Sequence, residues 1–238
     1  MKNPAVRQLA HRVSSAGTGV REHALDDHLR EVARRAADHA MPFGGRDWAH
    51  LAGLWHDLGK YRPGFQRYLR AATGVEAESA HIEGGAGRVS HSTAGALLAC
   101  ERFGTAGRVL AYLIASHHAG LYDWNSDTNS LEARLGLEAS RTELAEALAA
   151  APPGILDHGD FVPGRHPIPG GPTGFALWLR MLFSALVDAD FLDTEAFMDE
   201  GKVAARGVWP ELGALRAAFD AHMAGIASTA PDTPVNRL

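Results

Sequence analysis

The pair His56-Asp57 constrains the chain more than any other feature of the sequence. It lies inside the segment LAGLWHDLGK, whose apolar residues recur at helical spacing: Leu51, Leu54, Trp55 and Leu58. This pattern predicts a helix with one buried face, where an unpaired imidazole and carboxylate would be costly to bury. Adjacent helix residues project about 100° apart, so both side chains can reach one cleft and share a cation. For this pair alone, a surface histidine beside a solvated aspartate is an equal alternative.

Further histidines stand on the apolar sides of other predicted helices. They are His28, His91, His117 and His118, among 13 histidines in 238 residues. A lone histidine in such a place is more often a hydrogen-bonded core residue than a ligand. Several of them together with an acid favour a metal site, because packing alone gives no reason to prefer imidazoles. The single cysteine, Cys100, excludes a multi-thiolate zinc site, so nitrogen and oxygen must supply the ligands.

The segment GFALWLRMLFSALVDADFLDTE offers two more acids, Asp188 and Asp190. Two residues advance about 200° around a helix, so these side chains point to nearly opposite faces and only one can join a metal site. Asp190 shares the stripe of Phe183, Leu186 and Val187, which favours it as the ligand. Asp188 shares a more polar face with Arg180 and is kept as the fallback ligand.

Apolar periodicity predicts an all-α fold, because alternating strand-like runs are scarce. The expected helices are 21–40, 47–59 with Asp47 as N-cap, 91–102, 106–118, 131–150, 175–192, and one or two within 194–226. Residues 73–89 are expected to form a mobile loop that could gate the site, and 151–174 an irregular connection. The expected organisation is an N-terminal segment (1–20), one compact core (20–196), C-terminal helices packing on it (197–226) and a linker-like tail (227–238).

The formal net charge of −5 argues weakly against a surface that is basic all over. A nuclease that neutralises phosphates with bound cations needs only a local positive channel, so this class of protein stays open. No signal peptide and no run of about 18 apolar residues is visible. We therefore expect a soluble cytoplasmic protein without a membrane partner.

Taken in order, His28, His56-Asp57, His91, His117-His118 and Asp190 resemble the H…HD…H…H…D pattern of the HD superfamily of metal-dependent phosphohydrolases. The motifs HDLGK, SHS, SHH and LFSALVDADFLDTE narrow the resemblance to the HD nuclease domain of the type I CRISPR-associated nuclease-helicase. The resemblance covers roughly residues 20–196 and implies a single helical HD-domain fold. The tail DTPVNRL is similar to the stretch that leads into the helicase in fused members.

The resemblance also implies the ligands of two divalent metal ions. One ion would be held by His28, His56, Asp57 and Asp190, and the second by Asp57, His91, His117 and His118, with Asp57 as the bridge. Lys60 matches the family lysine and could steady a substrate phosphate, or it could be a solubilising cation at a helix end. His23, His50 and His81 match no motif position and are expected at the surface. Imidazole-rich sites favour Mn, Ni, Fe or Co over Mg.

The implied function is hydrolysis of single-stranded DNA in CRISPR antiviral defence, by an in-line mechanism with two ions about 3.5–4 Å apart. A helicase domain or subunit and the CRISPR DNA-surveillance complex are the implied partners. Two alternatives stay open on the sequence. One is an HD-family nucleotide phosphohydrolase, and the other is a non-catalytic docking module for a helicase or surveillance complex.

Overall fold

The computed structural model describes residues 7–15, 19–71, 91–126, 130–163, 170–206 and 210–233. It divides into two compact units, Met1–Asp199 and Glu200–Leu238. The expected loop at 73–89, with His81, and the last five residues of the tail lie outside the described residues. Within the described residues, no helix is long and apolar enough to cross a bilayer.

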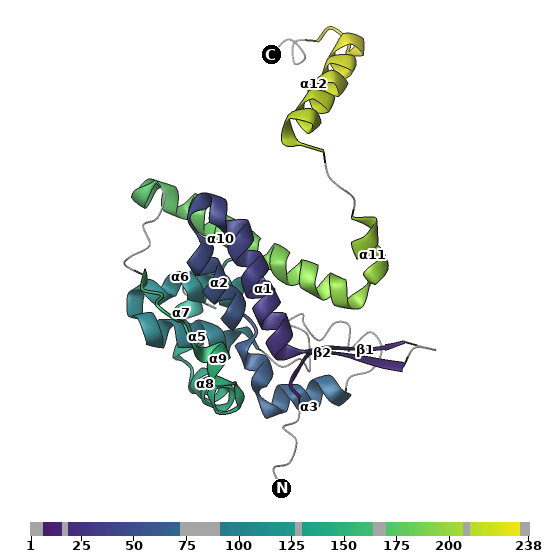
Figure 1. Cartoon of the computed structure of the whole chain (residues 1–238). Helices are drawn as coiled ribbons and strands as arrows, with labels where there is room; N and C mark the ends of the chain where they lie inside the picture. The colour runs from purple at the N-terminus through teal and green to yellow at the C-terminus, as the bar shows by residue number, and fades with distance from the viewer. Residues whose placement is uncertain are drawn as a thin grey trace. The chain divides into compact units, whose positions relative to one another are not determined.

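The first unit is built from helices packed around one apolar core, with a two-stranded hairpin beside them (Figure 1). Its α-helices are α1 (Leu25–Ala40), α2 (Arg46–Trp55), α3 (Pro63–Ala71), α5 (Ser92–Phe103), α6 (Gly107–Ser116), α7 (Leu131–Gly136), α8 (Glu138–Ala150), α9 (Pro153–Leu156) and α10 (Gly171–Met198). Short 3-10 helices are η1 (Met41–Phe43), η2 (Leu58–Tyr61) and η3 (Gly104–Ala106). The predicted mostly helical fold is confirmed.

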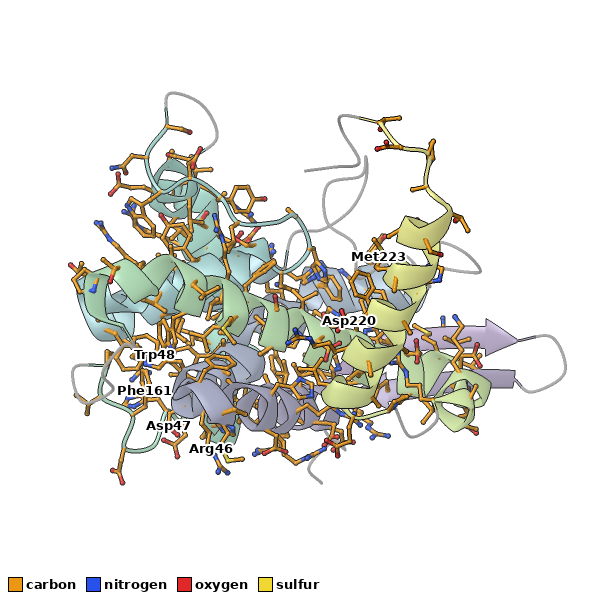
Figure 2. The ribbon with its side chains drawn as sticks, turned by 90° about the horizontal axis from the view of Figure 1, so that it is seen from above. Arg46, Asp47, Trp48, Phe161, Asp220 and Met223 are labelled. Atoms are coloured by element: carbon orange, nitrogen blue, oxygen red, sulfur yellow. The ribbon has the colours of Figure 1, made fainter. Side chains whose placement is uncertain are left out.

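Helices α1, α2 and α10 pack against one another and enclose part of the core (Figure 1). The apolar stripe of α1 is completely buried: Leu25, Leu29, Val32 and Ala36. The apolar residues around His56 are buried as well, from Leu51 to Leu58. At the other end of α2, the Trp48 ring packs edge-on against Phe161, with 5.0 Å between ring centroids (Figure 2). The predicted apolar faces are therefore the faces that build the core.

The hairpin corrects the prediction for the N-terminal region. Strands β1 (Leu9–Ser15) and β2 (Gly19–Ala24) pair antiparallel, so the helix expected from residue 21 begins only at Leu25. Residues 21–24 have helix-compatible composition, but pairing with β1 satisfies their backbone groups instead, and tertiary context of this kind overrides a weak local propensity. The pairing sets His11 opposite His23.

Other boundaries also differ from the predictions. The N-cap of α2 is Gly45, and Asp47 lies inside the first turn, where a carboxylate still favours the positive helix end. The helix expected at 131–150 breaks at Leu137, whose backbone is extended. Helix α10 runs from 171 to 198 and exceeds the expected 175–192, because Pro172 is tolerated in a first helical turn. Helix α3 was not predicted.

The second unit contains α11 (Glu200–Ala205) and α12 (Leu212–Thr229). Asp220 and Met223 lie on α12 (Figure 2). Apolar residues repeat along this helix at helical spacing: Leu212, Leu215, Phe219, Met223 and Ile226. The packing of residues 197–226 on the core stays a prediction.

Candidate metal centre

His56 and Asp57 occupy the turn in which α2 ends and η2 begins. Both side chains are buried. The His56 Nδ1–H donates to the carbonyl oxygen of Gly53 at 2.7 Å, three residues earlier. That bond leaves Nε2 as the ring nitrogen that faces the neighbouring acids. The same arrangement recurs after α6, where the His117 Nδ1–H donates to Ile114 O at 2.7 Å.

One group of side chains forms on the Oδ2 side of Asp57. His28 from α1 places its Nε2 at 3.4 Å from Asp57 Oδ2 and 3.4 Å from Asp190 Oδ1. His56 Nε2 lies 3.3 Å from Asp57 Oδ2 and 3.6 Å from Asp190 Oδ1. With metal–ligand bonds of about 2.0–2.2 Å, two ligands of one ion stand about 3–3.5 Å apart. These separations therefore suit a shared cation.

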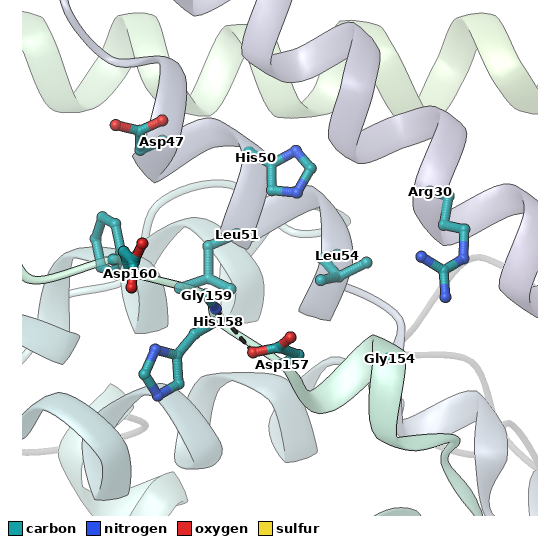
Figure 3. Close-up of a pocket in the computed structure, with 11 residues that line it drawn as sticks. Arg30, Asp47, His50, Leu51, Leu54, Gly154, Asp157, His158, Gly159 and Asp160 are labelled. Carbon is teal, nitrogen blue, oxygen red and sulfur yellow. Dashed lines mark hydrogen bonds between the residues drawn. The ribbon is translucent and has the colours of Figure 1, made fainter.

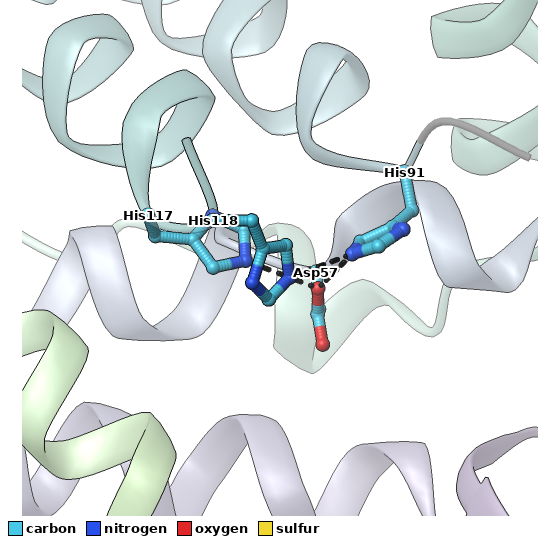
Figure 4. A group of neighbouring side chains, drawn as sticks. All are labelled: Asp57, His91, His117 and His118. Carbon is cyan, nitrogen blue, oxygen red and sulfur yellow. Dashed lines mark hydrogen bonds and ion pairs between the residues drawn. The ribbon is translucent and has the colours of Figure 1, made fainter. Parts of the chain in front are cut away.

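A second group forms on the Oδ1 side of the same carboxylate (Figure 4). Asp57 Oδ1 lies 3.3 Å from His91 Nε2 and 3.6 Å from His117 Nε2. The Nε2 atoms of His91 and His118 are 2.9 Å apart. The ligand atoms of these four residues all lie within 4.8 Å of one another. Asp57 thus stands between two sets of imidazoles, one facing each oxygen.

The donor atoms of this His/Asp cluster fit a bound metal. Within the cluster, four buried atoms have no hydrogen-bond partner among the described residues: His28 Nε2, His56 Nε2, Asp57 Oδ1 and His117 Nε2. Buried polar groups are normally paired, so a convergence of several unpaired ones requires explanation. All four are atoms that ligate divalent transition metals. A cation at each group would satisfy them.

Charges within the cluster strongly shift the pKa values of the cluster's own histidines and acids. Burial by itself lowers the pKa of His28, but the neighbouring carboxylates of Asp190, Asp193 and Asp57 outweigh burial and raise it to about 10. Burial likewise opposes the charged form of His56, yet Asp57 and Asp190 raise its pKa to about 9. Burial would raise the pKa of Asp57, whereas Lys60, His56 and His91 bring it well below its ordinary value. The acids are therefore ionised and the first two histidines hold protons that a metal would replace.

Asp188 and Asp190 of α10 have different positions, as their spacing predicts. Asp190 faces His28 and His56, and its side chain is 16% exposed. Asp188 is 64% exposed and lies 3.5 Å from His39 Nδ1, away from the cluster. The fallback ligand is therefore not brought to the site, because the 200° rotation between the two residues turns it outward.

Lys60 does not occupy the position expected of a surface cation. Its side chain is 1% exposed and its Nζ lies 2.6 Å from Asp57 Oδ2. The solubilising role is therefore wrong. A substrate phosphate could reach Nζ only by displacing the Asp57 carboxylate, so direct contact of Lys60 with a phosphate is not supported either. In this position the ammonium neutralises the central carboxylate.

Three residues beside the cluster were missed by sequence reasoning. Asp193 accepts from His28 Nδ1–H at 2.6 Å. His11 is buried and its Nδ1 lies 3.2 Å from His23 Nδ1, so the expected surface position of His23 is wrong. His50 is exposed, as expected. The i+3 spacing of Asp190 and Asp193 was a usable signal, whereas the histidine pair depends on the hairpin.

The cluster is closed on most sides. His28, His56, Asp57, His91 and His117 are all buried, whereas His118 is half-buried and Asp190 retains some exposure. We call the side at His118 and Asp190 the open edge. Among the described residues of the cluster, these two are the ones that solvent reaches, so we expect a reactant to approach from this edge.

A sizeable cavity lies elsewhere in the unit. It has a volume of about 720 Å³ and lies between α1, α2 and the 154–161 segment, with Arg30, His50 and Asp157 in its lining (Figure 3). None of the cluster residues lines it. Size alone therefore does not identify the reactive site here, and the unpaired ligand atoms do.

The chain matches a known protein family. The family model described as Cas3, HD domain matches residues 11–158, more than half of the chain. The matched range contains His28, His56, Asp57, His91, His117 and His118, and it ends before Asp190. A comparison with curated proteins gives no match.

Proposed function

Because the chain belongs to the family of Cas3 HD domains, we propose that it is a metal-dependent nuclease that hydrolyses single-stranded DNA with two bound cations. This family consists of the HD domains of Cas3-type CRISPR nuclease-helicases. The observation that carries the proposal is the convergence of unpaired buried ligand atoms of His28, His56 and His117 on the two oxygens of Asp57.

The chain's own residues would divide the work between two ion sites. His28, His56 and Asp190 hold the first site on the Oδ2 side of Asp57. His91, His117 and His118 hold the second on the Oδ1 side (Figure 4). When bound, two such cations supply an activated water and the positive charge that stabilises a phosphodiester undergoing in-line displacement. The imidazole content favours Mn, Ni, Fe or Co over Mg.

The open edge supports a single strand as the substrate. A phosphate can approach the cluster only past His118 and Asp190, because the other donors are buried. A single strand is flexible and can bring one phosphate into such an opening, whereas a duplex holds its phosphates on a stiff, wide cylinder. We propose that the helicase partner of the family supplies that strand, in association with the CRISPR DNA-surveillance complex.

The first experiment is cleavage of circular single-stranded DNA by chelator-stripped protein supplied with Mn, Ni or Mg. We expect endonucleolytic cutting with Mn or Ni, and Asp57→Ala should lower the rate by more than about 100-fold, since loss of even a supporting partner of a metal ligand costs about 10–100-fold. Circular dichroism checks that the variant stays helical. Cleavage by Asp57→Ala at the wild-type rate would contradict the bridging role.

A matched pair of variants on α10 tests which acid serves the site. Asp190→Asn should lose most of the cleavage, because that carboxylate faces His28 and His56. Asp188→Asn should cleave at the wild-type rate, because Asp188 is exposed and outside the cluster. Equal losses in both variants would reject the assignment. Release of phosphate from free nucleotides without any cutting of DNA would favour a nucleotide phosphohydrolase.

A further inference from the structure

A second carboxylate of α10 points to the cluster one helical turn after Asp190. Asp193 is 6% exposed, and its Oδ2 lies 2.6 Å from His28 Nδ1. His28 is completely buried. A distance this short between a ring nitrogen and a carboxylate indicates a strong, charge-assisted hydrogen bond in which Nδ1–H donates.

That bond decides which nitrogen of His28 faces the metal centre. With Nδ1 carrying the proton shared with Asp193, Nε2 is directed to Asp57 Oδ2 and Asp190 Oδ1, each at 3.4 Å. We propose that Asp193 is a positioning residue that fixes the ring orientation and tautomer of His28 for metal binding. This inference rests on the proposed function, since it assigns a role toward the same metal centre.

His28 differs from other cluster histidines in what holds its ring. His56 and His117 donate from Nδ1 to a backbone carbonyl three residues earlier, so their orientation follows from the local chain. His28 instead donates to a side chain 165 residues away in the sequence. The orientation of the His28 ring therefore depends on one other side chain, and a single substitution can remove that constraint. Carboxylate partners of ligating imidazoles orient the ring and raise its basicity.

The hairpin holds Asp193 from its other side. His23 of β2 places Nε2 at 3.7 Å from the same Oδ2, and its ring lies against the Phe197 ring of α10 with 4.8 Å between centroids. The facing residue on β1, His11, approaches His23 with 3.2 Å between the Nδ1 atoms. Asp193 thus connects α10 to both α1 and the hairpin. These contacts restrict rotation of the Asp193 side chain.

The experiment compares Asp193→Ala and Asp193→Asn with the wild type in the full chain. Asp38→Asn serves as the control, because Asp38 is an exposed carboxylate on α1, the helix that carries His28. Zinc affinity is measured by calorimetry, and the Nδ1 proton of His28 is observed by NMR of ¹⁵N-histidine-labelled protein, assigned with a His28→Asn variant. Thermal unfolding verifies that each variant is folded.

We expect Asp193→Ala to weaken zinc binding by about 10–100-fold and to abolish the downfield, slowly exchanging Nδ1 proton of His28. Asp193→Asn keeps a neutral acceptor, so it should lose less affinity and move that resonance upfield. Asp38→Asn should match the wild type. A folded Asp193→Ala variant that binds zinc within about twofold of the wild type, or that keeps the resonance, overturns the proposal.

The two readouts separate this inference from the proposed function. If the wild type binds no zinc and cuts no DNA, the proposed function fails. The Nδ1 resonance still reports on Asp193 in that event, because the hydrogen bond to His28 does not require a metal. If Asp193→Ala does not fold, the Asn variant decides through the position of the same resonance.

Discussion

Asp57 is the residue on which the charges of the site depend. Its two oxygens face four histidines and a lysine, and Lys60 Nζ lies 2.6 Å from Oδ2 with both side chains almost completely buried. Removing one partner of a buried ion pair is strongly destabilising, because the other charge stays behind without compensation. Lys60 is therefore a stabilising partner of the central carboxylate.

This gives a prediction for Lys60→Met in metal-free protein. The variant should lose about 3 kcal/mol of unfolding free energy, measured by urea unfolding in chelator. The matched control is Arg34→Met, which breaks the exposed pairs of Arg34 with Glu31 and Asp38 and should leave stability close to that of the wild type, because exposed ion pairs contribute little. Equal losses of unfolding free energy in the two variants would show that the buried pair stabilises the protein no more than exposed pairs do.

Histidine protonation predicts how the stability of the metal-free protein changes above neutral pH. The folded-state pKa values of His28, about 10, and His56, about 9, lie above the ordinary value of 6.5. Their contribution is fully present below pH 6.5 and is lost as pH rises through 9 to 10, because the unfolded chain has already released these protons. Urea unfolding in chelator should show falling stability from pH 7 to 9. A flat or rising profile would contradict this.

At acidic pH, other histidines change the stability of the folded protein in the opposite direction. Burial lowers the pKa of His23 to about 4 and lowers those of His11 and His118 as well. The unfolded chain then binds protons that the folded protein does not, so stability falls as pH decreases below 6.5. The ionised acids of the cluster add to this loss at still lower pH. Together with the previous prediction, maximal stability of the metal-free protein is expected near pH 6.5.

At the scale of elements, close backbone contacts fix the distance between the two groups of ligands. Gly59 of η2 donates its N–H to the carbonyl oxygen of His91 at 3.1 Å. A Cβ at Gly59 would fall on that same carbonyl. Gly95 of α5 lies in the same way against the carbonyl of Trp55, and it too has no space for a Cβ. Helix α5 can therefore bring His91 to Asp57 only because both positions are glycine.

We predict that Gly59→Ala displaces His91 from Asp57. The substitution should cost about 2 kcal/mol of stability through overpacking and should weaken metal binding more than it weakens the fold, as measured by calorimetry and thermal unfolding. Gly136→Ala is the matched control, because a Cβ there meets nothing within 4 Å. Unchanged metal affinity in Gly59→Ala would show that the backbone contact does not set the position of His91.

At the scale of the whole molecule, every cluster residue and the large core belong to the unit Met1–Asp199. The second unit contributes α11 and α12, with a repeated apolar stripe on α12. We therefore predict that a chain ending at Asp199 keeps a cooperative thermal transition and binds metal within about twofold of the full chain, as expected for a unit with its own core. Loss of metal binding on truncation would show that the C-terminal helices support the cluster.

Much of the cluster was predictable because the signals are local. The apolar periodicity around His28, His56 and His117 places each on a buried helix face, and helix rotation separates Asp190 from Asp188. The helix boundaries were less accurate, since the hairpin captures residues 21–24 and Leu137 breaks a segment that favours helix by composition. Short stretches of sequence therefore indicate which residues are candidate ligands.

Local signals in the sequence were sufficient to predict the helical fold class, the residue types of the candidate metal centre and most of the helices that carry them, because periodicity and spacing act over a few residues. Tertiary packing was needed to show that Lys60 is buried against Asp57, that His11 and His23 lie beside the cluster, and that Asp193 accepts a hydrogen bond from His28. These contacts join segments up to 165 residues apart. Lys60 and Asp57 are close in the sequence, but their burial depends on the segments that pack around them. The contact of Asp193 with His28 forms only when separate helices pack around a common core.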